Sequence, residues 1–266
     1  MKWLLVDGSY YNFFRYYAIV QWWGLAKKDE PMGVPIENPT FVDKFRSTFV
    51  DKMQEVRKKL DLKDAICVVG KDCPRKEIWR NALFDNYKGS RDKDDAFLGG
   101  PLFKMAYSDL FELAGVSAVL KHKNLEADDC VALFAKEILA KRPNDEITII
   151  TSDMDYLQLA GPRVRLFNLK YQELTKSKNS FDNAEKDKFV KIVCGDKSDD
   201  IPGVFAKCGP KTAAKLFDDK AAFEKKLDAE EGARERLARN TTLVDFNEIP
   251  QHLVDSFRQN VLGVSF

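Results

Sequence analysis

The stretch Ile147-Thr148-Ile149-Ile150-Thr151-Ser152-Asp153-Met154-Asp155 decides how this chain folds. Its first four residues are mostly apolar and β-branched, a pattern typical of a strand buried on both faces of a parallel sheet. Two carboxylates follow within five residues of the strand. In open α/β sheets, ligands bind beyond the carboxyl ends of the strands. The stretch therefore predicts a strand that delivers Asp153 and Asp155 to a ligand site.

Four other short apolar runs have the same character, namely Trp3 to Val6, Ala65 to Val69, Ser117 to Leu120 and Val164 to Phe167. Longer segments between them, such as Phe41 to Leu60 and Ala127 to Ala140, carry apolar residues at helical spacing. This alternation predicts an α/β fold with a central, mostly parallel sheet. After about residue 180 the strand pattern stops, and helices are expected at Phe181 to Cys194, Pro210 to Phe217, Ala221 to Leu227 and Glu231 to Arg239.

The composition is that of a globular protein and excludes several classes. Of the 266 residues 44% are hydrophobic, and the net charge of +1 does not by itself indicate a nucleic-acid-binding protein. No apolar run approaches the roughly 20 residues of a membrane span, and the N-terminus does not resemble a signal peptide. The five cysteines show no zinc-ligand spacing, so we expect free thiols in a reducing, cytoplasmic compartment. Neither His122 nor His252 lies in a motif.

Acidic residues follow the predicted strands repeatedly. Each group on its own is explained by helix capping. Parallel strands, however, end at one edge of the sheet, and like charges about 4 Å apart cost each other several kcal/mol at an effective dielectric near 20. A cation is therefore expected beside the carboxylates of Asp7, Asp72, Glu126, Asp128, Asp129, Asp153 and Asp155, with a further group at Asp196, Asp199 and Asp200.

The ligand chemistry of these groups favours a hard metal ion. Carboxylates without histidine or cysteine select Mg²⁺ or Mn²⁺ over zinc. Two such ions about 4 Å apart suit the in-line hydrolysis of a phosphodiester. The acidic groups therefore indicate a metal-dependent phosphodiesterase.

Two basic segments could hold a nucleic-acid substrate. Trp79-Arg80 and Tyr87-Lys88-Gly89-Ser90-Arg91 combine aromatic rings, which stack on unpaired bases, with cations that hold phosphate; the alternative is an ordinary solvated loop. The loop Gly203 to Ala213 leads into a helix N-terminus and is followed by Lys215. Backbone N–H groups and lysines there would clamp a duplex backbone, and the alternative is a plain packing element.

In this order the motifs resemble the 5′-nuclease superfamily, which includes flap endonucleases, the 5′-nuclease domains of bacterial DNA polymerase I, and ribonuclease H and 5′-3′ exonucleases of tailed phages. The resemblance implies a PIN-like catalytic domain over residues 1–180 and a helical DNA-binding lobe over 181–266. A helix-three-turn-helix motif is expected at about 189–217. The implied cofactors are two Mg²⁺ ions, which Mn²⁺ can replace, and a K⁺ ion at the helix-three-turn-helix loop. That loop has Phe205-Ala206-Lys207 where the family usually has an inner glycine.

The resemblance also assigns residues. The implied metal ligands are Asp7, Asp72, Glu126, Asp128, Asp129, Asp153, Asp155, Asp196 and Asp199. Lys88 and Arg91 are expected to activate the phosphate, with Asp153 as a further catalytic residue. The expected nucleic-acid contacts are Arg80, Tyr87, Lys88, Arg91, Lys207, Gly209, Lys211, Thr212 and Lys215.

The implied function is removal of RNA primers or 5′ flaps during DNA replication, in the cytoplasm of the cell or of a viral host. Substrates would be branched or 5′-ended duplex DNA and RNA/DNA hybrids. The resemblance implies a single-strand binding protein and a sliding clamp as partners. Gln259 to Phe266 loosely resembles a clamp-binding tail, and the alternative is an apolar tail that packs on its own domain. Two other functions stay open: a PIN-type ribonuclease acting on single-stranded RNA, and a non-catalytic protein that binds branched DNA.

Overall fold

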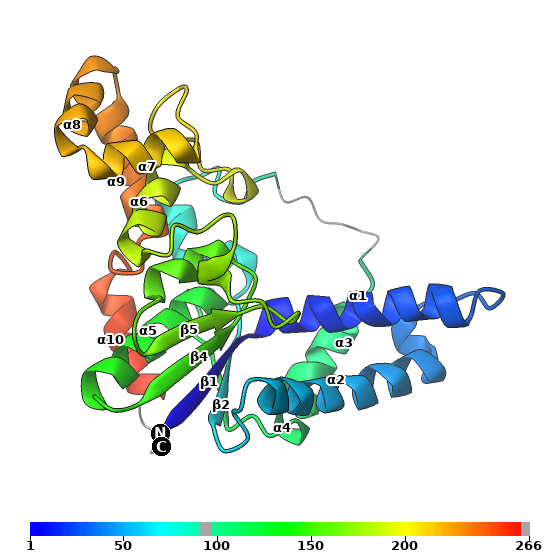
Figure 1. Cartoon of the computed structure of the whole chain (residues 1–266). Coiled ribbons are helices and arrows are strands. Elements are labelled where there is room, and N and C mark those ends of the chain that lie inside the picture. Colours follow the sequence, from blue (N-terminus) through cyan, green and yellow to red (C-terminus); the bar gives the residue numbers. More distant parts are fainter. Residues whose placement is uncertain (91–96, 262–266) are drawn as a thin grey trace.

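One parallel sheet organises the chain in the computed structural model, which describes residues 1–90 and 97–261. Its five strands are ordered β3-β2-β1-β4-β5 (Figure 1). Every neighbouring pair in it is parallel. The strands are β1 (Lys2–Asp7), β2 (Ile66–Gly70), β3 (Ala118–Leu120), β4 (Glu146–Ile150) and β5 (Val164–Phe167). The predicted α/β fold is confirmed, and each predicted strand is present with its ends shifted by at most one residue.

Helices cover both faces of the sheet (Figure 1). Side chains alternate along β1, so Trp3 and Leu5 pack against α5 (Ala127–Lys141) and α10 (Gln251–Val261). Leu4 and Val6 face α1 (Gly8–Ala26), α2 (Pro39–Lys59), α3 (Gly100–Met105) and α4 (Phe111–Leu113), with a π-helical segment (Ala106–Leu110) between the last two. Burial on two faces explains why the strands read as continuous apolar runs.

Helix α2 shows how sequence produces this packing. Phe41, Phe45, Phe49 and Met53 recur every fourth residue and are fully buried. Asn38 caps the helix, because its side chain accepts a hydrogen bond of 3.1 Å from the backbone N–H of Phe41. One face of α2 is thus fixed against the sheet by an aromatic stripe.

The order of the strands positions the site. From β1 the chain moves outward to β2 and β3, then returns to place β4 on the other side of β1. The direction of winding reverses between β1 and β4, and crevices at such switch points hold ligands. Asp7 ends β1 and Asp153 follows β4, so both carboxylates lie at this crevice.

A helical lobe follows the sheet, as predicted. It contains α6 (Ala184–Cys194), α7 (Pro210–Asp218), α8 (Lys220–Ala229) and α9 (Ala233–Val244). Val193, Val204, Phe205 and Leu227 belong to its own apolar core. Helix α6 also contacts the 3₁₀ segment Met154–Leu159 that follows β4, which joins the lobe to the carboxyl edge of the sheet.

Helix α10 is an element that the sequence analysis did not anticipate. Its residues Leu253, Val254 and Phe257 share one apolar core with the sheet and α5, so the chain returns to the α/β domain after the lobe. The boundary at residue 180 stays a prediction. The end of the proposed clamp-binding tail, residues 262–266, lies outside the described residues. Among the described helices, none has the length and apolarity needed to cross a membrane.

Candidate active site

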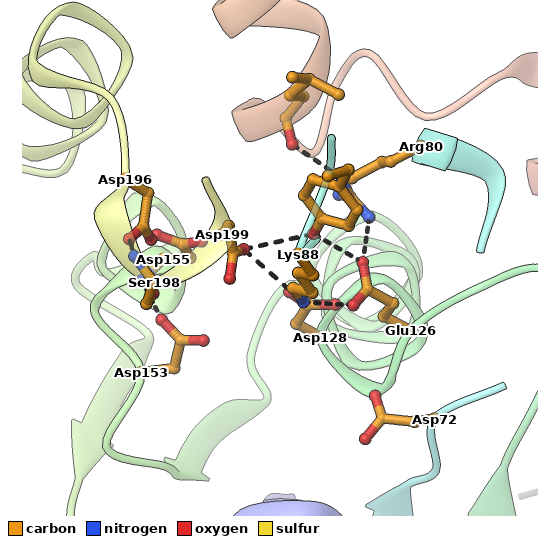
Figure 2. Close-up of polar contacts among 12 residues, drawn as sticks. Asp72, Arg80, Lys88, Glu126, Asp128, Asp153, Asp155, Asp196, Ser198 and Asp199 are labelled. Atoms are coloured by element: carbon orange, nitrogen blue, oxygen red, sulfur yellow. Dashed lines mark hydrogen bonds and ion pairs between the residues drawn. The ribbon is translucent and has the colours of Figure 1, made fainter. Parts of the chain in front are cut away.

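Carboxylates from three strand ends meet around one cavity of about 300 Å³ beyond the carboxyl edge of the sheet. Its acidic lining residues are Asp7, Asp72, Glu126, Asp128 and Asp153. Figure 2 shows Asp72, Glu126, Asp128 and Asp153 of this lining. Asp7 comes from β1, Asp72 from the segment after β2, and Asp153 from the turn after β4. The sheet therefore gathers the strand-edge carboxylates as the sequence analysis expected.

Asp7 is held by both neighbouring elements. One carboxylate oxygen caps α1 by accepting a 3.0 Å hydrogen bond from the N–H of Tyr10. The other accepts a 3.2 Å bond from the hydroxyl of Thr151, just after β4. Burial, together with the negative charge of Asp72, raises the pKa of Asp7 to about 6. A cation beside Asp7 would relieve both effects.

Asp72 lies two residues beyond the end of β2 and faces the same cavity. Its Oδ1 accepts a 2.7 Å hydrogen bond from the N–H of Ala127, and its Oδ2 accepts one from the Ser9 hydroxyl. Asp72 is thereby tied to the first turns of α1 and α5. Ser9 and Thr151 are supporting residues that the sequence analysis did not select as site residues.

Three carboxylates open helix α5. Glu126 and Asp129 form a reciprocal capping box, so the capping interpretation holds for these two. The three residues Glu126, Asp128 and Asp129 each offer a carboxylate oxygen, and these atoms lie within 4.8 Å of one another. Burial and the charges of Asp129 and Glu126 raise the pKa of Asp128 well above its usual range. The capping box therefore does not explain the third carboxylate, that of Asp128.

Arg80 is part of the scaffold beneath this group. Its side chain is 2% exposed, and its two terminal nitrogens each lie 2.8 Å from an oxygen of Asp129. It also binds Glu126 at 3.0 Å and donates to the carbonyl of Leu243 at 2.8 Å. Arg80 is therefore buried against two carboxylates in this structure, and its contact with a nucleic acid stays a prediction. It also occupies both oxygens of Asp129.

Tyr87 and Lys88 bridge the α5 carboxylates to the lobe. Lys88 Nζ binds Glu126 and lies 3.6 Å from Asp199 Oδ2. The Tyr87 hydroxyl lies 2.9 Å from Glu126 Oε2 and 3.3 Å from Asp199 Oδ2. Burial would lower the pKa of Lys88, but Glu126 and Asp199 raise it, so the ammonium stays charged. Arg91, the second predicted phosphate activator, lies outside the described residues.

A second group of three carboxylates forms where the lobe meets the sheet. Oxygens of Asp155, Asp196 and Asp199 lie within 4.8 Å of one another. Lys191 of α6 binds Asp196 and lies 2.6 Å from Asp155 Oδ1. The sequence analysis did not select Lys191, although a lysine five residues before an acidic loop was a usable signal.

Asp153 lies beside the second group, below Asp155 and Ser198 in the view of Figure 2. Its Oδ1 accepts a 2.9 Å hydrogen bond from the N–H of Asp155. Burial and the charge of Asp155 raise the pKa of Asp153 to about 7. One lysine already supplies a counter-charge to each group: Lys88 binds Glu126 in the first, and Lys191 binds Asp196 in the second. Oxygen-only donors with this excess of negative charge fit hard divalent cations.

The exposed lysines of the lobe surround the start of α7. Lys207, Lys211 and Lys215 are exposed, as are Gly209 and Thr212. Gly209 provides no side-chain cap and Pro210 is the first helical residue, so the positive end of the α7 dipole carries no side-chain acceptor. Phe205 of the preceding loop is buried in the lobe core. This arrangement suits a phosphate-binding helix end, while the K⁺ ion stays a prediction.

The fold and site define a PIN-like α/β protein with a carboxylate-rich centre at its strand edge and a helical lobe beside it. The chain belongs to the family of 5′-3′ exonuclease N-terminal, resolvase-like domains, whose sequence model matches residues 2–197. It is 30% identical over 145 residues to the flap endonuclease Xni of Shewanella halifaxensis, covering 52% of this chain and 54% of the relative. It is 31% identical over 160 residues to a 5′-3′ exonuclease of Bacillus subtilis, covering 57% of this chain and 52% of the relative. The matched region thus spans about half of each curated relative.

The similarity of fold extends over the whole chain. The crystal structure of the T5 D15 protein with metal ions aligns with a TM-score of 0.69 at 19% identity and covers 100% of both chains. A complex of the bacteriophage T5 D15 flap endonuclease with DNA and metal ions aligns with a TM-score of 0.67 at 20% identity, covering 99% of this chain and 98% of the other. At these identities the likeness is one of fold, and it includes the helical lobe.

Proposed function

We propose that this chain is a structure-specific 5′ nuclease, acting as a flap endonuclease and 5′-3′ exonuclease with activity on RNA/DNA hybrids. It removes RNA primers or 5′ flaps in DNA replication and leaves a 5′ phosphate. Family membership and the flap endonuclease and exonuclease relatives support this proposal. The observation that carries it is the pair of three-carboxylate groups, one at the start of α5 and one where the lobe meets the sheet.

The carboxylates are proposed to hold two Mg²⁺ ions, with Mn²⁺ as a substitute. One ion would be held by the cavity residues Asp7, Asp72, Glu126, Asp128 and Asp153, and the other by Asp155, Asp196 and Asp199 with their neighbours. When bound, the ions would neutralise the negative charge that develops on the attacking and leaving oxygens. Asp129 also accepts hydrogen bonds from Arg80 and, at 2.9 Å, from the indole N–H of Trp79, and its role as a metal ligand stays a prediction.

Lys88 would change partners when substrate and metal bind. In this structure its ammonium is held by Glu126 and Asp199. Metal ions bound by Glu126 and Asp199 would neutralise the negative charge of these carboxylates. The Lys88 ammonium would then be free to hold the scissile phosphate. We propose that Arg91, three residues further along the chain, assists it.

Aromatic side chains at the mouth of the cavity suit an unpaired base. Tyr10 and Phe13 of α1 line the acidic cavity, and Phe13 is 42% exposed. Phe13 stacks on Tyr17 with ring centroids 6.3 Å apart and an interplanar angle of 14°. A base placed on such a surface is stabilised by about 1 to 3 kcal/mol. The lysines around the start of α7 would meanwhile hold the duplex backbone without reading its sequence.

The remaining parts of the proposal concern setting and partners. The five cysteines are free thiols, which suits action in the cytoplasm of a cell or viral host. We infer a single-strand binding protein and a sliding clamp as partners, and a K⁺ ion at the helix-three-turn-helix loop, from the family resemblance alone.

The decisive experiment uses a labelled 5′-flap DNA with Mg²⁺, with EDTA, and with the Asp153→Asn variant. We expect cleavage only by the unaltered protein with Mg²⁺; cleavage that survives EDTA or the substitution contradicts the mechanism. An unstructured RNA of equal length tests the ribonuclease alternative, which predicts cleavage of that RNA in preference to the flap. Binding of the flap without any metal-dependent turnover would instead support the non-catalytic alternative.

A further inference from the structure

Asp200 is an acidic residue of the lobe that the metal site leaves unexplained. The sequence analysis grouped it with Asp196 and Asp199, but among the described residues the carboxylates that gather there are those of Asp155, Asp196 and Asp199. The side chain of Asp200 instead reaches the basic segment between β2 and α3. Its Oδ2 accepts a 2.7 Å hydrogen bond from the backbone N–H of Ser90, which is 110 residues away in the sequence. Asp200 therefore joins the lobe to the basic segment.

Lys88, in that basic segment, has a backbone conformation that a lysine rarely adopts. Its φ is +54°, in the left-handed region, where most side chains other than those of asparagine and aspartate cost free energy. Such a conformation persists only where the surrounding structure holds it, and it is found mostly at functional sites. From this turn the Lys88 ammonium lies between Glu126 and Asp199 (Figure 2). Contacts around the turn must therefore compensate for its cost.

Hydrogen bonds on both sides hold the turn at Lys88. The N–H of Lys88 donates to the Asp199 carbonyl at 2.9 Å, and the Lys88 carbonyl accepts a hydrogen bond from the guanidinium of Arg75. A further hydrogen bond joins the N–H of Ser90 to Asp200. Asp199 and Asp200 thus hold the turn from consecutive positions of the lobe. The place of Lys88 depends on this loop of the lobe.

The loop that contains Asp200 is itself firmly built. Asp196 and Ile201 exchange two backbone hydrogen bonds of 2.8 Å, which close the loop at its base. Asp200 is left-handed with φ +58°, a conformation that aspartate tolerates better than most residues. Ile201 and Tyr87, which adjoin the contact in sequence, are buried in one apolar cluster. Packing and hydrogen bonds therefore keep the loop and the turn in register.

We propose that Asp200 is a positioning residue for Lys88: its carboxylate holds the N–H of Ser90, and with it the left-handed turn that places the Lys88 ammonium at the metal site. The inference rests on the proposed function, in which Lys88 holds the scissile phosphate. Asp200 acts through the backbone of the turn and not through contact with metal or substrate. The loop that supplies metal ligands thereby also sets the place of the phosphate-binding lysine.

The test compares two replacements of Asp200. Asp200→Gly removes the carboxylate but adopts the left-handed conformation without strain, so the backbone of the loop is kept. Asp200→Asn keeps a side-chain oxygen that accepts the Ser90 N–H, and asparagine also tolerates this conformation. The matched control is Asp61→Gly, because Asp61 is an exposed left-handed aspartate, with φ +56°, beside Lys2 at the amino end of β1. Urea midpoints check that each variant keeps its fold.

Steady-state cleavage of a labelled 5′-flap DNA with Mg²⁺ separates positioning from binding. A misplacement of about 1 Å costs about 100-fold in rate, so Asp200→Gly should lower kcat by about 10- to 100-fold. KM should change by less than about twofold, because the lost contact acts only in the chemical step. Asp200→Asn should keep most of the activity, and Asp61→Gly should match the unaltered protein. Full activity of Asp200→Gly, or an Asp200→Asn variant that is equally slow, would overturn the proposal.

A double-mutant cycle with Lys88→Ala tests whether Asp200 acts through Lys88. Residues that act as one unit are strongly non-additive. Once the lysine is removed, Asp200→Gly should therefore lower kcat by less than about twofold. A loss of full size in the Lys88→Ala background would show that Asp200 acts by another route and would refute its positioning role.

Amide hydrogen exchange in the metal-free protein gives a readout that does not depend on cleavage. The N–H groups of Lys88 and Ser90 should exchange faster in Asp200→Gly than in the unaltered protein, Asp200→Asn or Asp61→Gly. Equal exchange in all four proteins would show that the carboxylate does not hold the turn. If the unaltered protein cleaves no flap, the proposed function fails, while the exchange rates still decide whether Asp200 holds the turn of Lys88.

Discussion

Lys191 Nζ lies 2.6 Å from Asp155 Oδ1 and also binds Asp196, so one ammonium from α6 joins the turn after β4 to the acidic loop that follows α6. The side chains of Lys191, Asp155 and Asp196 are 22%, 14% and 13% exposed, respectively. This contact fixes the lobe against the sheet at the second carboxylate group. It also marks the place where a metal ion and a lysine compete for the same oxygens.

Replacing Lys191 by alanine should destabilise the metal-free protein. Two largely buried carboxylates would lose their shared counter-charge, at a cost of about 1 to 3 kcal/mol. Mg²⁺ should restore most of the loss by supplying the missing positive charge. Urea denaturation with and without Mg²⁺ measures both effects. Lys186→Ala on the same helix is the control, because its partner Asp218 is exposed and its loss should cost less than about 1 kcal/mol. An equal loss with and without Mg²⁺ would argue against a metal at this group.

Arg80→Met should be among the most destabilising single substitutions in the chain. It leaves the fully buried Asp129 and the buried Glu126 without their guanidinium partner, which costs about 3 to 5 kcal/mol. The stability of Arg80→Lys should lie between that of the unaltered protein and that of Arg80→Met, because lysine keeps the charge but not the bidentate contact with Asp129. Urea midpoints measure the series, with Arg46→Met as an exposed control. Weakened DNA binding at unchanged stability would instead restore the direct nucleic-acid role that the sequence suggested.

The stabilising effect of Mg²⁺ should increase with pH. The pKa values of Asp7 and Asp153, about 6 and about 7, lie above the ordinary 3.8, first through burial and then through Asp72 and Asp155 respectively. Carboxyls with a raised pKa favour folding while they are protonated. Their contribution to the free energy of unfolding is therefore complete below about pH 3.8 and is lost as the pH rises through 6 to 7. A divalent cation takes the place of these protons.

Thermal unfolding at pH 5.5 and pH 8 checks this pH dependence. We expect the rise in Tm on adding Mg²⁺ to be clearly larger at pH 8, with KCl at matched ionic strength as the control. A rise of the same size at both pH values would show that metal binding does not displace these protons.

Phe13→Ala should weaken cleavage of flaps with an intact base next to the scissile bond. Loss of one stacked base costs about 1 to 3 kcal/mol in kcat/KM, and Phe13→Tyr should keep most of the activity. Leu25→Ala is a matched control, because Leu25 is 67% exposed near the far end of the same helix. A flap with an abasic site at that position supplies the readout. The alanine variant and the unaltered protein should cleave it equally, and a persistent difference would assign Phe13 a packing role only.

The sequence by itself determined the sheet and the acidic edge. Short apolar runs and the residues that follow them are local patterns, and parallel strands necessarily end at one edge, so Asp7, Asp153 and the α5 carboxylates could be placed together without coordinates. Helical spacing likewise located α2, α5 and α6 to within a few residues.

Only the tertiary structure decided which side chains share a partner. Arg80 Nε donates to the Leu243 carbonyl across 163 residues of sequence, and Tyr87 reaches Asp199 across 112. No local pattern encodes such distances, because the pairing depends on where the lobe and α9 pack. The same reason explains why Arg80 was not foreseen as the partner of Asp129 and why Lys191 emerged as the counter-charge of the second group. Helix α10, in contrast, has Leu253, Val254 and Phe257 at helical spacing, a local signal that the sequence analysis overlooked. Sequence periodicity placed the carboxylates, and long-range packing set the charges that surround them.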